Sequence, residues 1–223
     1  MPVDMERFYK AYYRNVVFRQ HQGMLPGDDT VGEGVCSALC YEWVKQNMEG
    51  SYNVQNWTRE NPIFRKFAVP EGSPIGRKFP HLTNVRIGMP KVQPGMALKQ
   101  KIVNLSSNNL GTERNFEMLA RKDQHRVALV SKWTDLKGGG ADVAEQIQKH
   151  SVRFRQGYGL IGIVNPRGHA TACQIAGSIN RYYDPNLGEF RFSDINEFME
   201  AFTLMWEVAD YKFKDLYLWT LYL

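Results

Sequence analysis

The stretch GEGVCSALCYEWVKQ, residues 32–46, marks the point where a glycine-containing loop passes into a helix. From Cys36 onward the apolar residues recur at helical spacing, and Leu39 and Trp43 fall on one face. The chain has three cysteines, and two of them, Cys36 and Cys40, lie in the first two turns of this helix. The pattern predicts a helix with a cysteine at its N-terminus.

A cysteine in this position is suited to nucleophilic chemistry. The thiolate is the reactive form, and a free thiol has a pKa near ~8.5. The unpaired N–H groups and the dipole of a helix N-terminus lower that pKa, and the same groups face any oxyanion formed there. Cys36 is therefore the candidate nucleophile, whereas Cys40, one turn deeper, is expected to be a small core residue. The competing interpretations are two inert buried thiols, or a metal site, for which a CxxxC pair on a helix lacks the usual loop spacing.

The bulk composition limits the class of protein. A chain of 223 residues, of which 43% are hydrophobic, is long enough for one domain with a substantial core. Three cysteines argue against a secreted disulfide scaffold, and the charged, amphipathic N-terminus does not resemble a cleavable signal peptide. No window approaches the ~18 apolar residues of a membrane span. The net charge of +5 is scattered and no zinc-finger or RNA-binding motif occurs, so we expect a soluble protein without a nucleic-acid partner.

The order of the expected elements defines the fold class. Helical patterns dominate the first part of the chain, and short strands with one amphipathic helix follow. We expect helices at 4–21, 36–48, 112–135 and 141–150, strands at 158–165, 168–177, 179–192 and 214–223, and a helix at 193–209 with Ser193 as its N-cap. This predicts an α+β protein, a single domain of residues 1–223 with a helical half of about 1–150 and a sheet half of about 151–223.

Two of these strands bring a histidine close to an aspartate. In GHATACQIAGSINRYYDP, residues 168–185, a two-residue turn that begins at Gly177 places Thr171 opposite Asp184. His169 then lies two residues from Thr171 on the same face as Asp184. A turn that begins one residue earlier places His169 directly opposite Asp184. Either register brings the two side chains within reach of a hydrogen bond, whereas an odd-numbered loop would separate them.

Together with Cys36 these residues form a candidate catalytic triad. His169 would accept the thiol proton and later return it to the leaving group, and Asp184 would hold the imidazole in the correct tautomer. Asn186 is a second candidate for the orienting role, because an amide replaces the carboxylate in some triads. Considered singly, His169 is better interpreted as a histidine at a strand edge than as a catalytic residue. Likewise, Asp184 considered singly is better interpreted as a turn residue before a proline. The joint pattern is what favours catalysis.

Three segments carry a resemblance to a known family: GVCSALCYEWV, GHATACQ and YYDPNLGEFRF. They resemble the YopT-type cysteine proteases, a papain-like family of bacterial type III effectors delivered into host cells. The family pattern is a G-x-C helix start with a downstream Trp, an H-A pair on a strand, and an aromatic-D-P-N-x-G-x-F segment. In this sequence the pattern falls on Gly34, Cys36, Trp43, His169, Ala170, Tyr183, Asp184, Pro185, Asn186, Gly188 and Phe190.

The resemblance implies a papain-like fold, with the cysteine helix packed against an antiparallel sheet that carries the histidine and the aspartate. It implies a cysteine endopeptidase that uses no metal and no cofactor and cleaves a protein of a host or target cell. It further implies a secreted bacterial effector, without a cleavable signal peptide, that acts in the target-cell cytoplasm. The oligomeric state, the substrate and the scissile bond stay open.

One part of the family pattern is missing. Papain-like enzymes carry a Gln or Asn shortly before the cysteine as an oxyanion donor, and here the corresponding positions are Val31 and Thr30. Gln20 and Gln22 lie further upstream, and Gln22 is the candidate for this role. The long stretch 50–150 matches nothing in the family pattern, so substrate specificity does not carry over.

Two other functions use the same residues or the same scaffold. A glutamine deamidase or transglutaminase toxin, or a peptidoglycan amidase, would run through the same thioester chemistry. A new peptide N-terminus distinguishes proteolysis from ammonia release with an intact chain. The non-enzymatic alternative is a binding protein that has a papain-like scaffold but does not use the three residues for catalysis. In that case the Cys36 thiol would be no more reactive than an ordinary thiol.

Overall fold

The computed structural model describes residues 5–20, 36–60, 87–90, 111–134, 139–164, 168–208 and 215–223. Within them the helices are α1 (Met5–Ala11), α2 (Cys36–Met48), α3 (Val54–Trp57), α7 (Gly111–Lys122), α8 (Gly140–Ser151) and α9 (Ile195–Val208), with 3-10 turns η1 (Tyr13–Asn15) and η4 (Arg155–Gly157). The strands are β1 (Val16–Gln20), β2 (Thr58–Glu60), β3 (Ile87–Pro90), β4 (Arg126–Trp133), β5 (Tyr158–Val164), β6 (Gly168–Ala176), β7 (Ile179–Asp184), β8 (Gly188–Phe192) and β9 (Asp215–Tyr222). None of the described helices is long and apolar enough to cross a membrane.

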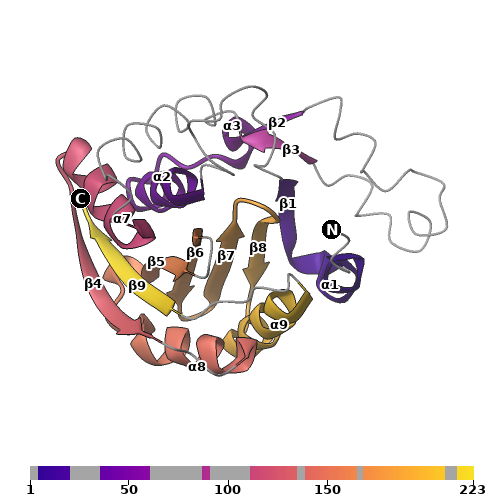
Figure 1. The fold of residues 1–223 in the computed structure, drawn as a ribbon. Coiled ribbons are helices and arrows are strands. Elements are labelled where there is room, and N and C mark those ends of the chain that lie inside the picture. The colour runs from indigo at the N-terminus through magenta and orange to yellow at the C-terminus, as the bar shows by residue number, and fades with distance from the viewer. Residues whose placement is uncertain are drawn as a thin grey trace.

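The described strands form one sheet with the order β2-β3-β1-β8-β7-β6-β5-β9-β4. All neighbouring pairs are antiparallel except β1 and β3. Helices α2 and α7 cover one face of this sheet, and α1, α8 and α9 cover the other (Figure 1). The molecule therefore has three layers with the sheet in the middle. Strands β1 to β4 come from the part of the chain expected to be mainly helical, so the sheet draws on both parts.

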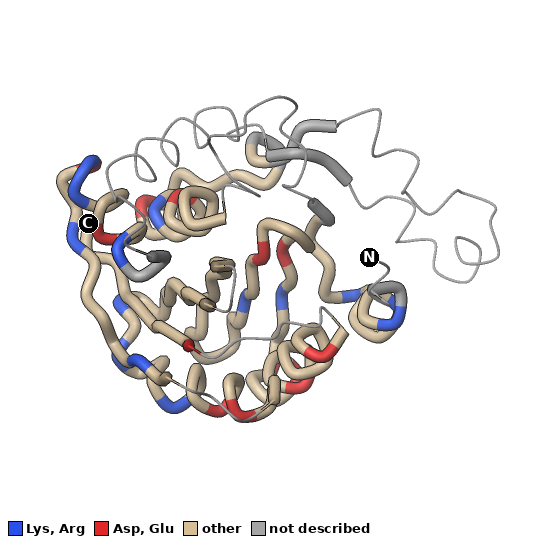
Figure 2. Tube along the Cα trace, in the orientation of Figure 1, with Lys and Arg blue, Asp and Glu red and all other residues tan. Residues whose placement is uncertain are grey.

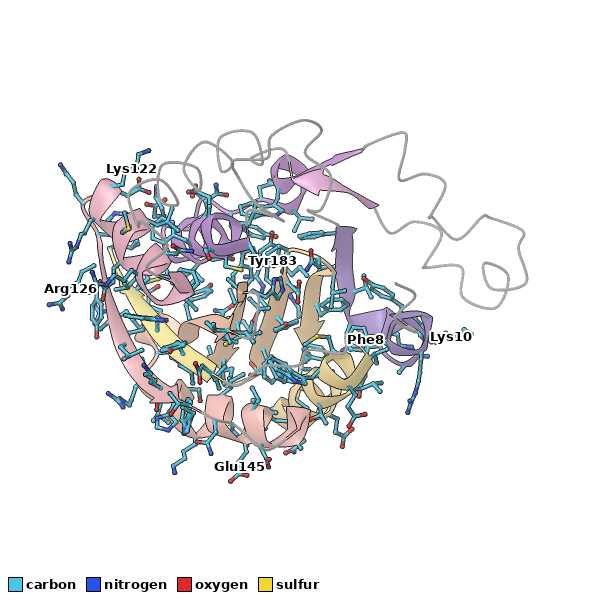
Figure 3. The ribbon with its side chains drawn as sticks, in the orientation of Figure 1. Phe8, Lys10, Lys122, Arg126, Glu145 and Tyr183 are labelled. Carbon is cyan, nitrogen blue, oxygen red and sulfur yellow. The ribbon has the colours of Figure 1, made fainter. Side chains whose placement is uncertain are left out.

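Alternation along the central strands separates two hydrophobic cores. Successive side chains of a strand point to opposite faces of a sheet. Tyr183 accordingly packs on the α2 side with Leu39 and Trp43, whereas Tyr182 packs on the α9 side with Phe202. Figure 3 labels Tyr183, which lies between the sheet and α2. Burial of each such large side chain stabilises the fold by about 1.5–3 kcal/mol, so both helical layers are held to the sheet by its own alternating residues.

The elements with the clearest periodic patterns lie where the sequence predicts them. The helix expected at 36–48 is α2, with the same bounds. The hairpin of β6 and β7 turns at Gly177, whose φ of +62° is a conformation that glycine adopts without strain. Ala176 pairs with Ile179, which is the first of the two registers considered for this hairpin. The mixture of helices with an antiparallel sheet confirms the α+β class.

Two of the expected helices are too long. The helix expected at 4–21 ends at Ala11, and β1 follows and pairs with β8. The helix expected at 112–135 ends at Lys122, and β4 follows and pairs with β9. Both strands contain runs of valine and other apolar residues that suit a pleated sheet. Pairing with a strand distant in sequence overrides the helical spacing seen locally.

The N-cap of α9 is also different from the expected Ser193. Oδ1 of Asp194 accepts hydrogen bonds from the backbone N–H groups of Asn196, at 2.5 Å, and Glu197, at 3.3 Å. These are the second and third residues of the helix, which is where an N-cap side chain bonds. Asp194 is the N-cap, and its charge also suits the positive end of the helix dipole.

Gly140 sets how closely α8 approaches α9, and this gives a test of the packing. A Cβ at Gly140 would lie 2.7 Å from Cβ of Trp206 and 2.9 Å from the carbonyl oxygen of Thr203, whereas a Cβ at Gly139 meets nothing within 4 Å. Gly140→Ser should therefore lower the free energy of unfolding by about 1–3 kcal/mol through overpacking. Gly139→Ser, the matched control at the N-cap of α8, should change it by less than about 0.5 kcal/mol. Urea unfolding measures both, and equal values would contradict this packing.

Candidate active site

Cys36 is the first residue of α2, and the structure places it beside the start of β6. The thiol is half-buried. Burial alone would raise its pKa, but the hydrogen bond and the positive charge of His169 lower it, with the backbone N–H of Ala170 and the Ser37 side chain as further donors. The pKa of Cys36 therefore lies below the ordinary value of a thiol. This is the shift that favours the nucleophilic thiolate.

His169 and Asp184 meet across the β6–β7 hairpin. Ala172 pairs with Tyr183, so Asp184 falls opposite Thr171, two residues from the histidine. Nε2 of His169 lies 3.1 Å from Oδ1 of Asp184. With Nε2 engaged by the carboxylate, Nδ1 is the ring nitrogen left to exchange a proton with the thiol. The structure thus brings Cys36, His169 and Asp184 together from one helix and two strands.

Asp184 is fixed by its own turn and its own strand. The side chain is fully buried. Its Oδ1 also accepts the backbone N–H of Asn186 at 2.7 Å, and its Oδ2 accepts the hydroxyl of Tyr182 at 3.2 Å. A second turn bond runs from the N–H of Leu187 to the Asp184 carbonyl at 3.0 Å. These hydrogen bonds hold the carboxylate in one orientation. Asn186, the second candidate for the orienting role, takes part through its backbone N–H, which donates to Asp184.

The charges of the site stabilise one another. Burial alone would lower the pKa of His169, but the charge and hydrogen bond of Asp184, and the neighbouring Cys36, raise it to about 10. The raised pKa of His169 and the lowered pKa of Cys36 both favour an imidazolium beside a thiolate. The imidazole of His169 thus lies between the Cys36 thiol and the Asp184 carboxylate.

Cys40 and Cys173 lie in the opposite electrostatic setting. Both are fully buried. The Cys40 thiol donates a hydrogen bond to the carbonyl of Ala170 at 3.2 Å, and burial together with the negative groups nearby raises its pKa well above the ordinary value. Burial raises the pKa of Cys173 to about 12. The expectation that Cys40 is a core residue is confirmed.

A buried ion pair joins α2 to the sheet. Nε and Nη2 of Arg181, on β7, donate to Oε1 of Glu189, on β8, at 2.9 and 2.6 Å. Oε2 of Glu189 accepts the indole N–H of Trp43, on α2, at 3.1 Å and the hydroxyl of Tyr52. Nη1 of Arg181 donates to the side chain of Asn47, also on α2. Every strong hydrogen-bonding direction of the carboxylate is used, as a buried charge requires.

Aromatic stacking completes this junction. The Arg181 guanidinium lies 4.8 Å from the ring centre of Trp43. The ring of Tyr183 stacks against the same indole, with 5.5 Å between the ring centres and an angle of 7° between the ring planes. The sequence interpretation used Trp43 as a packing residue and as part of the family pattern, and it did not include Arg181 or Glu189. The signal was present, since Arg181 lies two residues from Tyr183 and Glu189 pairs with Tyr183, so both charged residues fall on the face that α2 covers.

Some expected features lie outside the described residues. Gln22, the candidate oxyanion donor, and the positions Val31 and Thr30 are among them, and most of the stretch 61–110 is as well. Within the described ranges no group of three or more His, Cys, Asp or Glu side chains is arranged to hold a metal ion.

A helix that starts with a cysteine and packs on an antiparallel sheet carrying a histidine and an aspartate is the arrangement of the papain-like fold. A solved structure supports this class: the crystal structure of the Pseudomonas avirulence protein AvrPphB matches with a TM-score of 0.53. The match covers 90% of this chain and 98% of that one, at 16% sequence identity. No protein-family model and no curated protein sequence matches the chain. The likeness is therefore one of fold.

Thiol labelling tests the electrostatics of the site. Because the pKa of Cys36 is lowered, a larger fraction of this thiol than of an ordinary thiol should be thiolate at about pH 6. Iodoacetamide should then alkylate Cys36 and leave Cys40 and Cys173 unmodified. In His169→Ala the imidazolium is lost and burial remains, so the midpoint of Cys36 labelling should move to higher pH. Peptide mass mapping over a pH series measures this, and labelling of Cys36 that ignores the histidine would contradict the assignment.

The junction between α2 and the sheet can be tested by stability. Glu189→Gln leaves Arg181 buried without a counter-charge, so the free energy of unfolding should fall by about 3–5 kcal/mol. The double variant Arg181→Met/Glu189→Leu removes both charges and should lose less than the single one. Glu49→Gln, at an exposed carboxylate, is the control and should change stability by less than about 0.5 kcal/mol. A Glu189→Gln variant as stable as the wild type would show that the pair does not hold the helix.

Proposed function

We propose that the chain is a papain-like cysteine endopeptidase in which Cys36 is the nucleophile, His169 the general base and acid, and Asp184 the orienting residue. The observation that carries the proposal is the alignment of these three side chains, with the Nε2 to Oδ1 distance of 3.1 Å and the lowered pKa of the thiol. A lowered thiol pKa requires a specific partner, and the buried cysteines of this chain have raised pKa values instead.

The chemistry follows from the proton positions. The Cys36 thiolate attacks the carbonyl carbon of the scissile amide and forms a tetrahedral intermediate. The imidazolium of His169 gives its proton to the departing amine, and the C–N bond breaks to leave a thioester. A water molecule then loses a proton to the neutral imidazole and attacks the thioester, which releases the acid and the Cys36 thiolate beside the regenerated imidazolium. Asp184 holds the ring through Nε2 in both steps and stabilises its charge.

The developing negative charge lies at the N-terminus of α2. The first N–H groups of a helix have no partner within the helix and point outward. Those of Cys36 and Ser37 are therefore placed to donate to an oxyanion bound at the thiol. Gln22 remains the candidate for a side-chain donor to the same oxygen. Its role rests on the sequence resemblance.

The substrate class follows from the resemblance and from the fold. The motifs around Cys36, His169 and Asp184 resemble those of YopT-type effectors, and the matching structure belongs to a protein named as an avirulence protein. We infer a secreted bacterial effector that cleaves a protein in the cytoplasm of a host or target cell. The Cys-His-Asp chemistry needs neither a cofactor nor a metal.

Mapping of new N-termini tests the proposed function. Purified wild-type protein, incubated with a lysate of eukaryotic cells, should create neo-N-termini that mass spectrometry detects and that are absent with Cys36→Ala. Asp184→Ala should lower the cleavage rate by at least about 10²-fold, since the imidazole loses its orientation. Asn186→Ala should lower it by less than about 10-fold, because its contact with Asp184 is made by the backbone. Ammonia release from intact proteins, without neo-N-termini, would replace proteolysis with deamidation.

A further inference from the structure

A shallow apolar groove runs between α8 and α9, on the face of the sheet opposite to α2 (Figure 1). It has a volume of about 360 Å³ and is lined by Ala141, Ala144, Met199, Glu200, Thr203, Leu204 and Glu207. The lining of α9 is one stripe of that helix, because Met199, Thr203 and Glu207 recur every four residues and Glu200 and Leu204 lie next to them. The groove is thus formed by two regular helices.

Small residues on α8 open the groove. Gly140 lets the start of α8 touch α9 at Trp206 and Thr203, and Ala141 and Ala144 follow with the smallest side chains. The larger side chains of Met199 and Leu204 on α9 are consequently only half-buried. Apolar surface in this position remains available to a further apolar group.

The rim of the groove is acidic although the whole chain carries a net charge of +5. Glu200 and Glu207 line the groove and are exposed, and Asp142 and Glu145 lie on the exposed side of α8. Figure 2 shows acidic positions along α9 and α8, of which α8 also carries Lys149 in its last turn, and Figure 3 shows Glu145 pointing outward. The segment Ile195–Val208 contains no lysine or arginine. A cationic partner is therefore favoured here and an anionic membrane surface is repelled.

We propose that this groove, defined by the seven lining residues above, binds a cationic amphipathic helix of a partner protein. Apolar side chains of that helix would lie against Met199 and Leu204, and its lysines or arginines would pair with Glu200 and Glu207. A helix is the fitting occupant, because α8 and α9 satisfy their own backbone groups and offer no strand edge for an extended peptide. The groove lies across the sheet from Cys36, so this inference goes beyond the proposed activity and does not depend on it.

Fluorescence anisotropy tests the proposal with a defined probe. The probe is a fluorescein-labelled 18-residue peptide of leucine and lysine in which leucine recurs at helical spacing, titrated with the full chain carrying Cys36→Ala so that the probe stays intact. Glu200→Gln/Glu207→Gln should raise Kd by at least about tenfold at low ionic strength. Ala141→Trp, which fills the groove without a change of charge, should weaken binding as well. Hydrogen exchange should place the protection by the peptide on α8 and α9.

Matched controls separate this site from general attraction of charges. Glu49→Gln/Glu117→Gln makes the same change of net charge on α2 and α7 and should leave Kd within about twofold of the parent. A peptide of equal composition, reordered to lose its apolar face, should bind at least about tenfold more weakly. Equal effects of the two double variants, or equal binding of the two peptides, would overturn the proposal.

Self-association is the other decisive outcome. If sedimentation shows a dimer that Glu200→Gln/Glu207→Gln dissociates and that the peptide does not displace, the groove is an interface between copies of this chain and the proposal fails. Circular dichroism of each variant confirms that it is folded. Labelling of the Cys36 thiol in the same variants, with Cys36 restored, should be unchanged. Failure of the groove is thereby distinguished from failure of the catalytic assignment.

Discussion

The ion pair between Arg181 and Glu189 is the interaction on which the arrangement of the site depends. Two buried charges are costly to desolvate, and the cost is offset only while all their partners stay in place. Two of these partners, Trp43 and Asn47, belong to α2, so the helix is held in one position on the sheet. The same β7–β8 hairpin carries Asp184. One polar junction thus sets where α2, which begins at Cys36, lies relative to the Asp184 carboxylate.

With α2 fixed, its two cysteines experience opposite electrostatic fields although they are one turn apart. Cys36, at the helix start, meets the charge of His169, and its pKa is lowered. Cys40 lies inside the core, where burial and the negative charges of Cys36 and Asp184 raise its pKa. The thiol of Cys40 still has a use, because its hydrogen bond to the Ala170 carbonyl joins α2 to the strand next to His169. The surroundings of each cysteine along α2 therefore determine its pKa and its reactivity.

Local patterns predicted the parts of this site that are local. The helix start at Cys36 and the two-residue turn at Gly177 follow from spacing and turn chemistry, and that turn alone brings His169 beside Asp184. Pairing between distant segments was not predictable from spacing, so β1 and β4 were expected to be helical. The Arg181–Glu189 pair was missed for a related reason. A charged residue in a strand is read as exposed until the helix that covers it is known.

The two faces of the sheet meet in adjacent residues of β7. Tyr183 stacks on Trp43 of α2, whereas the hydroxyl of Tyr182 bonds to Oδ2 of Asp184 and lies 3.8 Å from the sulfur of Met205 on α9. The ring of Tyr182 also packs edge-on against Phe202 of α9, at 5.3 Å. A shift of α9 would therefore move the Tyr182 hydroxyl and alter the solvation of the Asp184 carboxylate. A helix bound in the groove could act on Asp184 by this route only if it bound α9 more tightly in the shifted position than in the present one. The difference between those two binding free energies is the largest effect that it could have.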